Sequence, residues 1–340
     1  MTHEIKDIIE AYLKAKEKGL KTVLASVVDL KGSSYRKPGV RMLILEDGSM
    51  IGAVSGGCVE KDILRQSETV FKNGVPKMMT YDGRYRLGCE GVLYILIEFF
   101  QPNAEFIYAF NSTIKNREAF KIHSQYKTVD GEDRDIGTYF EFKNENFPIS
   151  NREDNINEAS DSLLLFSQTM PPCFKLMIFG TEHDAVELCQ LARFNGWEVT
   201  VISGPLESKT INNFPGACAF YSVSPDTLEL KSIDDETAIV LMSHNFANDL
   251  KYLIELKDTR PVYLGMLGPT KRREKILSQF LEYCPDVDEA FLDLIYGPAG
   301  LNIGAETPQE IAISILSEIL SVTRKKTPMP LKEKIGRIHS

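Results

Sequence analysis

The sequence lacks long hydrophobic runs and has no segment typical of a targeting signal. Its longest apolar stretch covers residues 92–97, far short of the roughly 20 residues that a helix needs to cross a bilayer. The first 19 residues are charged and amphipathic, which does not fit a secretory signal peptide. These absences predict a cytoplasmic protein without a membrane partner.

Basic blocks and paired cysteines are absent as well. The chain has 39 Lys and Arg against 48 Asp and Glu, a net charge of −9, with no basic block interleaved with aromatic residues. This balance disfavours binding to nucleic acid. The six cysteines (58, 89, 173, 189, 218 and 284) form no Cys-x-x-Cys pair, and a disulfide framework is not expected in the reducing cytoplasm.

Catalytic signatures are also missing. The sequence contains no Ser-His-Asp order, His-Glu-x-x-His zinc motif, Walker A sequence or paired carboxylates. Its 340 residues and 43% apolar content predict two or three domains with a sizeable core. The residues alone thus indicate an anion-binding, thiol-bearing α/β protein, with no catalytic residue identified.

Residues 1–100 have the pattern of an α+β domain. Apolar residues at helical spacing predict a first helix that ends at Gly19, and a second helix is expected at 59–72. Strands are expected at 21–28, 41–45, 50–54, 77–81 and 92–99, with Asp47-Gly48 as a hairpin turn. Residues 101–170 form an irregular linking or inserted subdomain, with strands at 119–128 and 138–143 and a polar surface loop at 143–160.

Residues 171–325 alternate strands with helices, which predicts parallel βαβ units and a Rossmann-like domain. The expected strands are 174–179, 198–203, 237–243 and 262–266, and the expected helices are 184–195, 245–257, 271–281 and 308–320. The last helix opens with Thr307-Pro308-Gln309-Glu310, a capping box with proline at the first helical position. Residues 326–340 form a basic tail.

Two cysteines follow glycine-bearing turns. Cys58 comes directly after Ser55-Gly56-Gly57, where a helix begins. The positive end of the helix dipole lowers the pKa of a thiol there, and a thiolate suits a soft metal or sulfur transfer. Cys89 lies in a comparable loop, residues 86–91. The alternative is that both are small core residues, since free cysteine is often buried.

A cationic loop precedes the first of these turns. Arg36, Lys37 and Arg41 lie close in sequence to Gly32-Ser33-Ser34. Backbone amides of a glycine turn together with a guanidinium group make a good phosphate site. The alternative is a solvated loop without a ligand.

The loop at 180–185 occupies the place of a dinucleotide fingerprint, after a strand and before a helix. Glu182 replaces the second glycine of that fingerprint. Its carboxylate about 4 Å from a phosphate charge costs roughly 4 kcal/mol at an effective dielectric of 20. The next strand ends at Ser203, where no acidic residue is available for a ribose hydroxyl. A damaged NAD site is therefore expected.

Three further positions in this half carry chemistry. His183 and His244 each follow a strand and are either a zinc pair facing one crevice or simple helix caps. Gly268 opens a loop that leads into Lys271-Arg272-Arg273, which suits an anionic ligand or a charged helix face.

Taken together, the motifs resemble a known family. The pattern Gly32-Ser33-Ser34-x-Arg36-Lys37-Pro38-Gly39-x-Arg41, followed by Gly56-Gly57-Cys58-Val59-Glu60 and Gly88-Cys89-x-Gly91, is similar to the N-terminal signature of XdhC/CoxI proteins. The second half, with Gly265-x-Leu267-Gly268 and Gly300-Leu301-x-Ile303-Gly304-Ala305, resembles their Rossmann-type domain. These proteins are accessory factors of xanthine dehydrogenase and CO dehydrogenase.

The resemblance implies a chaperone rather than an enzyme. It implies that the chain binds a molybdopterin-type cofactor transiently, protects it while a cysteine desulfurase-like donor supplies sulfur, and inserts it into a xanthine dehydrogenase-type apoenzyme, acting as a homodimer. Cys58 and Cys89 would contact the molybdenum. The expected cofactor-binding residues are Gly32, Ser33, Ser34, Arg36, Arg41, Gly56, Gly57, Cys58, Glu60, Cys89, Gly180, His183 and Gly268. The alternatives are an NAD(P)-dependent oxidoreductase and an interaction scaffold without a ligand.

Overall fold

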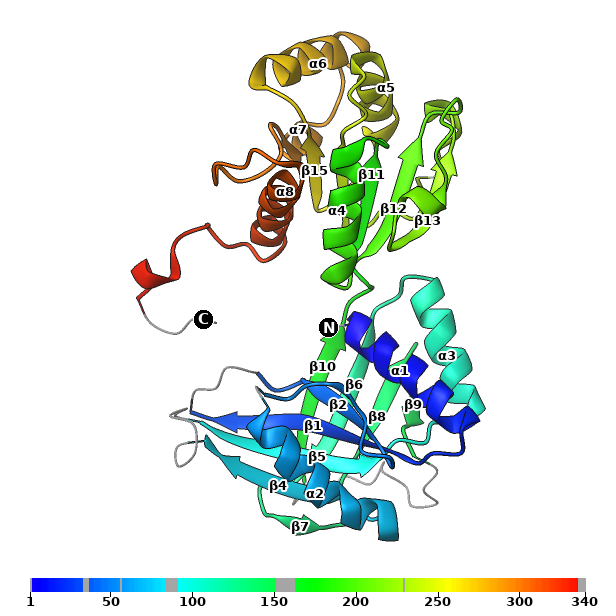
Figure 1. The fold of residues 1–340 in the computed structure, drawn as a ribbon, viewed down its shortest axis with the longest axis vertical. Helices are drawn as coiled ribbons and strands as arrows, with labels where there is room; N and C mark the ends of the chain where they lie inside the picture. The colour runs from blue at the N-terminus through cyan, green and yellow to red at the C-terminus, as the bar shows by residue number, and fades with distance from the viewer. Residues whose placement is uncertain are drawn as a thin grey trace. The chain divides into compact units, whose positions relative to one another are not determined.

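The structure is a computed structural model that describes residues 2–32, 37–55, 57–83, 91–150, 163–228 and 230–335; the side chain of Cys58 is also outside the description. The chain divides into two compact units, Met1–Pro172 (unit 1) and Cys173–Ser340 (unit 2). Unit 1 contains antiparallel sheets and unit 2 a parallel sheet, which confirms the predicted fold class (Figure 1).

Unit 1 contains two antiparallel sheets. Sheet A has the strand order β3-β2-β1-β5-β4-β7 and sheet B the order β10-β6-β8-β9. The strands of sheet A are β1 (Thr22–Lys31), β2 (Arg41–Leu45), β3 (Met50–Gly52), β4 (Lys77–Asp82), β5 (Val92–Phe99) and β7 (Gly131–Glu132). Those of sheet B are β6 (Phe120–Tyr126), β8 (Gly137–Phe142), β9 (Glu145–Pro148) and β10 (Leu164–Met170).

Helices cover the apolar faces of these sheets. Helix α2 (Cys58–Asn73) packs Val59, Ile63 and Val70 against one face of sheet A, and each such side chain contributes roughly 1.5–3 kcal/mol by leaving water. Helices α1 (Thr2–Glu17) and α3 (Ala104–Lys115) share a second core with sheet B and with Leu24 and Leu43 of sheet A. Sheet A is therefore buried on both faces.

Residues 101–170, which the sequence sets apart, contribute helix α3, sheet B and strand β7 to unit 1. The expected strands at 119–128 and 138–143 are confirmed as β6 and β8. The expected polar loop at 143–160 is wrong over its first part, because β9 forms there and pairs with β8. Residues 151–162 lie outside the described residues.

Unit 2 has one parallel sheet with the order β13-β12-β11-β14-β15-β16, the doubly wound 3-2-1-4-5-6 arrangement of a Rossmann fold. Its strands are β11 (Lys175–Phe179), β12 (Glu198–Ser203), β13 (Ala217–Ser222), β14 (Thr237–Leu241), β15 (Tyr263–Met266) and β16 (Ile295–Tyr296). Three short 3-10 turns complete the unit, at Ile211–Asn213, Pro225–Thr227 and Leu331–Glu333.

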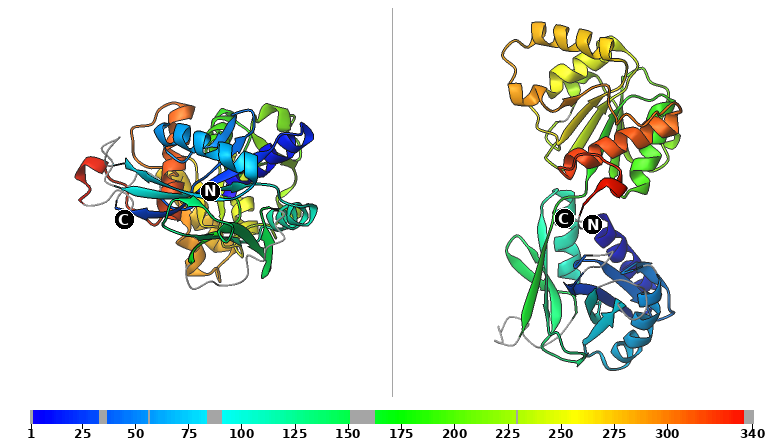
Figure 2. Two further views of the ribbon diagram at one scale, coloured as in Figure 1. Left: turned by 90° about the horizontal axis from the view of Figure 1, so that it is seen from below. Right: turned by 90° about the vertical axis from the view of Figure 1, so that its left-hand side faces the viewer.

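Helices α4 (His183–Phe194) and α8 (Pro308–Thr323) cover one face of this sheet. Helices α5 (Phe246–Leu256), α6 (Thr270–Tyr283) and α7 (Glu289–Leu292) cover the other face (Figure 2). The capping box predicted for α8 is present, with Thr307 and Glu310 each bonded to the other's backbone. Each expected strand and helix of this half is confirmed to within a few residues.

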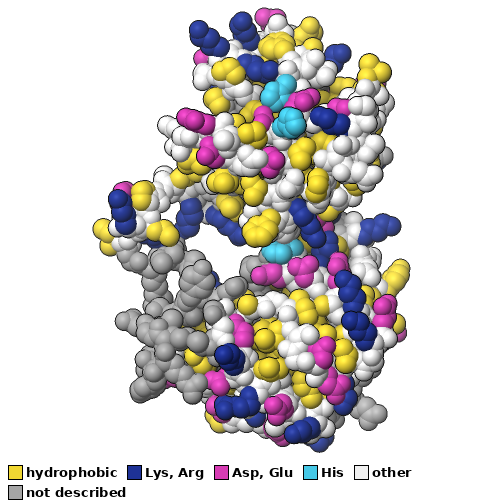
Figure 3. Space-filling model, viewed as in Figure 1, with side chains coloured by type: hydrophobic (Ala, Val, Ile, Leu, Met, Phe, Trp, Pro, Cys, Tyr) yellow, Lys and Arg dark blue, Asp and Glu magenta, His cyan; other side chains and the backbone are white. Residues whose placement is uncertain are grey.

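Two surface properties bear on function. Among the described residues, no helix combines the length and the apolar character needed to cross a membrane. On the face drawn in Figure 3, acidic and basic side chains are interspersed over both units, without a broad patch of basic residues.

Candidate functional site

The predicted loops of unit 1 are all attached to one end of sheet A, here called the loop end. Neighbouring strands run antiparallel, so the ends of β1 and β4 lie beside the start of β5, and the end of β3 lies beside the start of β2 (Figure 1). The start of β2 pairs with Ser26, five residues before the end of β1. Lys31 and Asp82 both pair with Val92, and Gly52 pairs with Met42. The topology thus gathers the connections 32–40, 53–57 and 83–91 at one end of the sheet.

Glu60 holds the turn that precedes α2. Its carboxylate accepts hydrogen bonds from the backbone N–H of Ser55 (2.6 Å), the Ser55 hydroxyl (2.8 Å) and the backbone N–H of Gly57 (2.8 Å). Glu60 is only 6% exposed. Burial opposes its ionisation, but these hydrogen bonds outweigh burial and lower its pKa below 4.5. Glu60 therefore acts on the turn from within, as a charged cap of the helix.

The turn before α2 contains a glycine that the described residues do not crowd. Gly57 has a φ of 116°, a left-handed conformation that favours glycine. A Cβ built on it would meet no heavy atom of the described residues within 4 Å. Cys58 follows as the first residue of α2, so the expected helix start is confirmed. The backbone amides there lie at the positive end of the helix dipole.

Arg41, the first residue of β2, is buried and only 5% exposed. Its Nη1 donates to the carbonyl of Gly39 (2.8 Å) and to the side chain of Gln168 in β10 (2.6 Å). Desolvation lowers the pKa of Arg41 to about 10, so the side chain remains a cation at neutral pH. Within unit 1 it connects the 32–40 loop to sheet B, and its role toward a phosphate stays a prediction.

Several predicted residues cannot be placed. Gly32 follows the first strand with a φ of 90°. The predicted site residues that lie outside the described part of the chain are Ser33, Ser34, Arg36, Gly56 and Cys89. Their cofactor-binding roles stay predictions, as does the contact of Cys58 and Cys89 with a metal. Only the described residues that flank them locate these loops.

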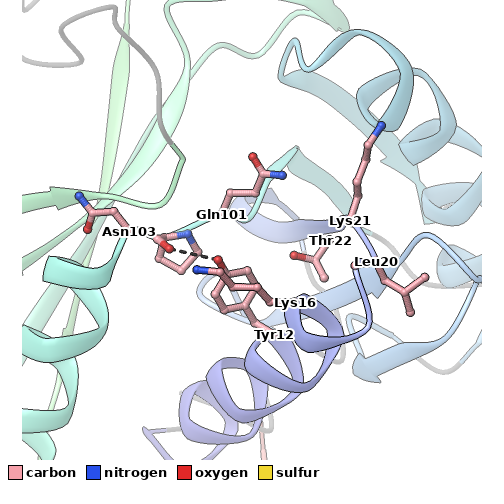
Figure 4. Close-up of a pocket in the computed structure, with 9 residues that line it drawn as sticks. Tyr12, Lys16, Leu20, Lys21, Thr22, Gln101 and Asn103 are labelled. Atoms are coloured by element: carbon pink, nitrogen blue, oxygen red, sulfur yellow. Dashed lines mark hydrogen bonds between the residues drawn. The ribbon is translucent and has the colours of Figure 1, made fainter.

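A hollow of about 320 Å³ lies at the other end of β1 (Figure 4). Tyr12, Lys16, Thr22 and Asn103 are among its lining residues, and the Tyr12 hydroxyl donates to the carbonyl of Pro102 (3.1 Å). Because β1 has ten residues, its two ends are roughly 30 Å apart. This hollow is therefore separate from the loop end of sheet A.

In unit 2, a crevice of about 440 Å³ lies at the carboxyl ends of β11, β12 and β14, where doubly wound sheets bind ligands. Gly180 and Glu182 both line it. A Cβ on Gly180 would lie 2.3 Å from the carbonyl oxygen of Met242, so glycine is required there by the approach of the β14 end. Glu182 is the N-cap of α4, and its side chain does not cap the helix.

Glu207, which lines this crevice, and Lys209, which contacts the same turn, were not predicted from the sequence. Ser203 ends β12 as expected, but the chain then returns over the 180–182 turn. Glu207 accepts hydrogen bonds from the Thr181 hydroxyl and the backbone N–H of Lys209. The Lys209 ammonium donates to the Thr181 carbonyl (2.5 Å) and lies 3.6 Å from the Glu182 carboxylate. An acidic residue does follow β12, four positions later than expected.

The remaining predicted positions lie elsewhere in unit 2. His183 begins α4, and His244 pairs with Asp184 (3.3 Å) rather than with His183. Within the described part of the chain, no group of three His, Cys, Asp or Glu could hold a metal. A Cβ on Gly268 would lie 2.8 Å from Cδ of Arg272, so this glycine makes room for an arginine. The roles of His183 and Gly268 toward a cofactor stay predictions.

Arg272 is used inside unit 2. Its Nη2 donates to the carboxylate of Asp249 (2.6 Å), whose side chain is 2% exposed. The same carboxylate accepts from the backbone N–H (3.2 Å) and the hydroxyl (2.5 Å) of Ser243. The pair therefore joins α6 to α5 and to the end of β14, and Nη2 of this guanidinium is used inside unit 2.

Comparison with known proteins gives matches along most of the chain. A model of the XdhC and CoxI family matches residues 15–82, and a model of the XdhC Rossmann domain matches residues 176–319. A Bacillus subtilis protein, named as a probable subunit of xanthine dehydrogenase, is 27% identical over 94% of this chain and 97% of its own length. The molybdenum cofactor insertion chaperone PaoD of Escherichia coli is 23% identical over 95% of this chain and 90% of its own.

The fold is shared with a solved structure. A crystal structure described as a xanthine dehydrogenase from Bacillus halodurans superposes with a TM-score of 0.76 at 24% identity, covering 94% of this chain and 96% of that one. These matches together account for the motifs at the loop end, the antiparallel unit 1 and the doubly wound unit 2. The chain belongs to the XdhC and CoxI family.

Proposed function

We propose that this protein is an insertion chaperone for the molybdenum cofactor of a xanthine dehydrogenase-type enzyme. The observation that carries the proposal is the topology of sheet A, which gathers the three motif loops at one end. The names of two relatives support it, since one is a molybdenum cofactor insertion chaperone and the other is a probable part of xanthine dehydrogenase.

The chemistry of the loop end suits such a cargo. Amides at a helix N-terminus favour an anionic group such as a terminal phosphate, and Gly57, directly before α2, has no described heavy atom within 4 Å of its Cβ position. A thiolate at Cys58, the first residue of α2, suits molybdenum or its sulfur ligands because both are soft. Glu60 keeps the turn in place, and its predicted contact with the cofactor stays a prediction.

The later steps complete the proposal. The chain holds the cofactor while a cysteine desulfurase-like donor replaces an oxo ligand by sulfido, and then passes it to the apoenzyme. It works in the cytoplasm as a homodimer. The described cysteines Cys173, Cys189, Cys218 and Cys284 form no disulfide, in keeping with a reducing compartment.

Cofactor retention tests the proposal. The protein is incubated anaerobically with free molybdenum cofactor, separated from small molecules by gel filtration, and oxidised to the fluorescent pterin. Wild type should retain pterin, and Cys58→Ala should retain roughly tenfold less, equivalent to 1.4 kcal/mol. Cys218→Ala, which removes an exposed thiol of unit 2, should behave as wild type. Equal retention by wild type and Cys58→Ala would refute the proposal.

A further inference from the structure

The crevice of unit 2 has an apolar wall as well as polar groups. Ile202, Pro225 and Tyr252 line it together with the 180–182 turn and the loop after β12. Ile202 is fully buried and Tyr252 is 2% exposed, and the Tyr252 ring packs edge-on against Phe179. The crevice volume of about 440 Å³ is in the range of small-molecule sites, roughly 300–1,000 Å³. The apolar surface that a ligand could contact is therefore mainly that of the half-buried Pro225.

Tyr252 also carries a polar group that the protein does not use. Its hydroxyl makes no hydrogen bond to any residue that the structure describes, although the residue is almost completely buried. Burial, and then the nearby Asp249, raise its pKa, so the hydroxyl keeps its proton at neutral pH. Because Tyr252 lines the crevice, this hydroxyl is available to bond a ligand there.

Glu182 is the acceptor with spare capacity. Its side chain is 55% exposed, it does not cap α4, and its contact within the described chain is the 3.6 Å ion pair with Lys209. Glu207, by contrast, already accepts from Thr181 and Lys209. The crevice therefore presents one available carboxylate at its rim and one available hydroxyl in its wall.

The charges of the crevice disfavour a dinucleotide. A pyrophosphate would lie against the 180–182 turn, where the carboxylates of Glu182 and Glu207 face a single ammonium group from Lys209. Each carboxylate about 4 Å from a phosphate charge opposes binding by roughly 4 kcal/mol at an effective dielectric of 20. A neutral ligand that donates N–H groups has no such penalty, and its hydrogen bonds to a carboxylate are charge-assisted.

We propose that this crevice binds the pterin ring of the cofactor, with Glu182 accepting hydrogen bonds from the 2-amino group and the adjacent ring N–H. Two parallel N–H donors on one edge match the two oxygens of a carboxylate. The ring lies against Pro225, and the Tyr252 hydroxyl donates to a ring or substituent acceptor. This inference rests on the proposed function for its choice of ligand. It assigns to unit 2 the recognition of the heterocycle.

The test uses 6-hydroxymethylpterin, a neutral and fluorescent pterin without phosphate, titrated against the full-length protein. Glu182→Gln should weaken binding roughly tenfold, because an amide offers one acceptor oxygen and no charge. Tyr252→Phe, which removes only the hydroxyl, should weaken it roughly threefold to tenfold. Glu274→Gln, which neutralises an exposed glutamate of α6 outside the crevice, should bind as wild type.

Two further ligands, guanosine and NAD, test whether the crevice prefers a pterin to other compounds with similar groups. Guanosine shares the amino and N–H edge but not the second pterin ring, and it should bind more weakly than the pterin. NAD should bind more weakly still. Guanosine binding as tightly as the pterin, NAD binding more tightly, or Glu182→Gln binding with wild-type affinity would each overturn the inference.

The cofactor-retention assay keeps this inference distinct from the proposed function. In one outcome, Cys58→Ala loses cofactor retention while Glu182→Gln binds the pterin as wild type. This outcome would overturn the assignment of the crevice and leave the chaperone function standing. Pterin binding that depends on Glu182, without cofactor retention by wild type, would support the crevice assignment and overturn the chaperone function.

Discussion

Replacing Arg272 by methionine should strongly destabilise unit 2. The substitution keeps much of the aliphatic stem and removes the guanidinium that pairs with Asp249. The Asp249 side chain is 2% exposed, so its charge would stay in the interior with only the hydrogen bonds from Ser243. Removing one partner of a buried pair costs about 3–5 kcal/mol, which is a large part of the stability of a typical domain.

Unit 2 contains a matched control for this experiment. Arg260 pairs with Asp288 over the same distance, 2.6 Å, but these side chains are 51% and 54% exposed. Arg260→Met should therefore lower the free energy of unfolding by less than about 1 kcal/mol. The two variants differ in the burial of the pair and share the chemistry of the substitution.

Urea unfolding followed by tryptophan fluorescence measures the effect. Trp197 is the single tryptophan of the chain, and it is 6% exposed in the core of unit 2. Its emission therefore reports this unit alone. The double variant Asp249→Asn, Arg272→Met should recover part of the loss, because no uncompensated charge remains. Equal losses for Arg272→Met and Arg260→Met would refute the reasoning.

Three other predictions follow from the same structure. Gly180→Ala should destabilise unit 2 by about 1–3 kcal/mol or more, because φ is 147° and the new Cβ would meet a backbone carbonyl at the end of β14. Thr307→Ala should cost about 1 kcal/mol through loss of the α8 cap. Trp197 fluorescence in urea measures both, and an unchanged midpoint would contradict either. Glu60→Gln should reduce the loss of unit 1 stability on acidification. Circular dichroism from pH 7 to 3 measures this loss. Since the folded pKa of Glu60 is lowered below 4.5, its contribution is present above that value and is lost as pH falls through the folded pKa. A wild-type acid profile in the variant would contradict this reasoning.

The regular elements were largely predictable from the sequence because their apolar patterns are local. The hairpin of β2 and β3 around Asp47-Gly48, the start of α2 at Cys58 and the cap of α8 each follow from a few adjacent residues. Helix α3 was not predicted. Its Phe106 and Phe110 pack on Phe140 and Phe142, so its stability comes from strands that lie about thirty residues later.

The site residues were harder to predict because their partners are distant. Glu207 lies beyond the residues that directly end β12, and nothing local shows that its loop returns to Thr181. The sequence left Arg272 open between an anionic ligand and a charged helix face, and the structure pairs it with Asp249 of another helix. Side chains whose charges and hydrogen bonds are paired within the fold cannot be distinguished from available ones without the tertiary structure.

The attachment of three connections to one end of sheet A does not free their sequences from the folding of unit 1. The free energy of folding is supplied by side chains such as Ile63 and Leu43, which lie in cores along the two faces of the sheet. Of the described residues in the connections, Val40 and Val54 also pack in one of these cores. Loops grafted from a relative would therefore need an apolar residue at each of these two positions to keep that core filled.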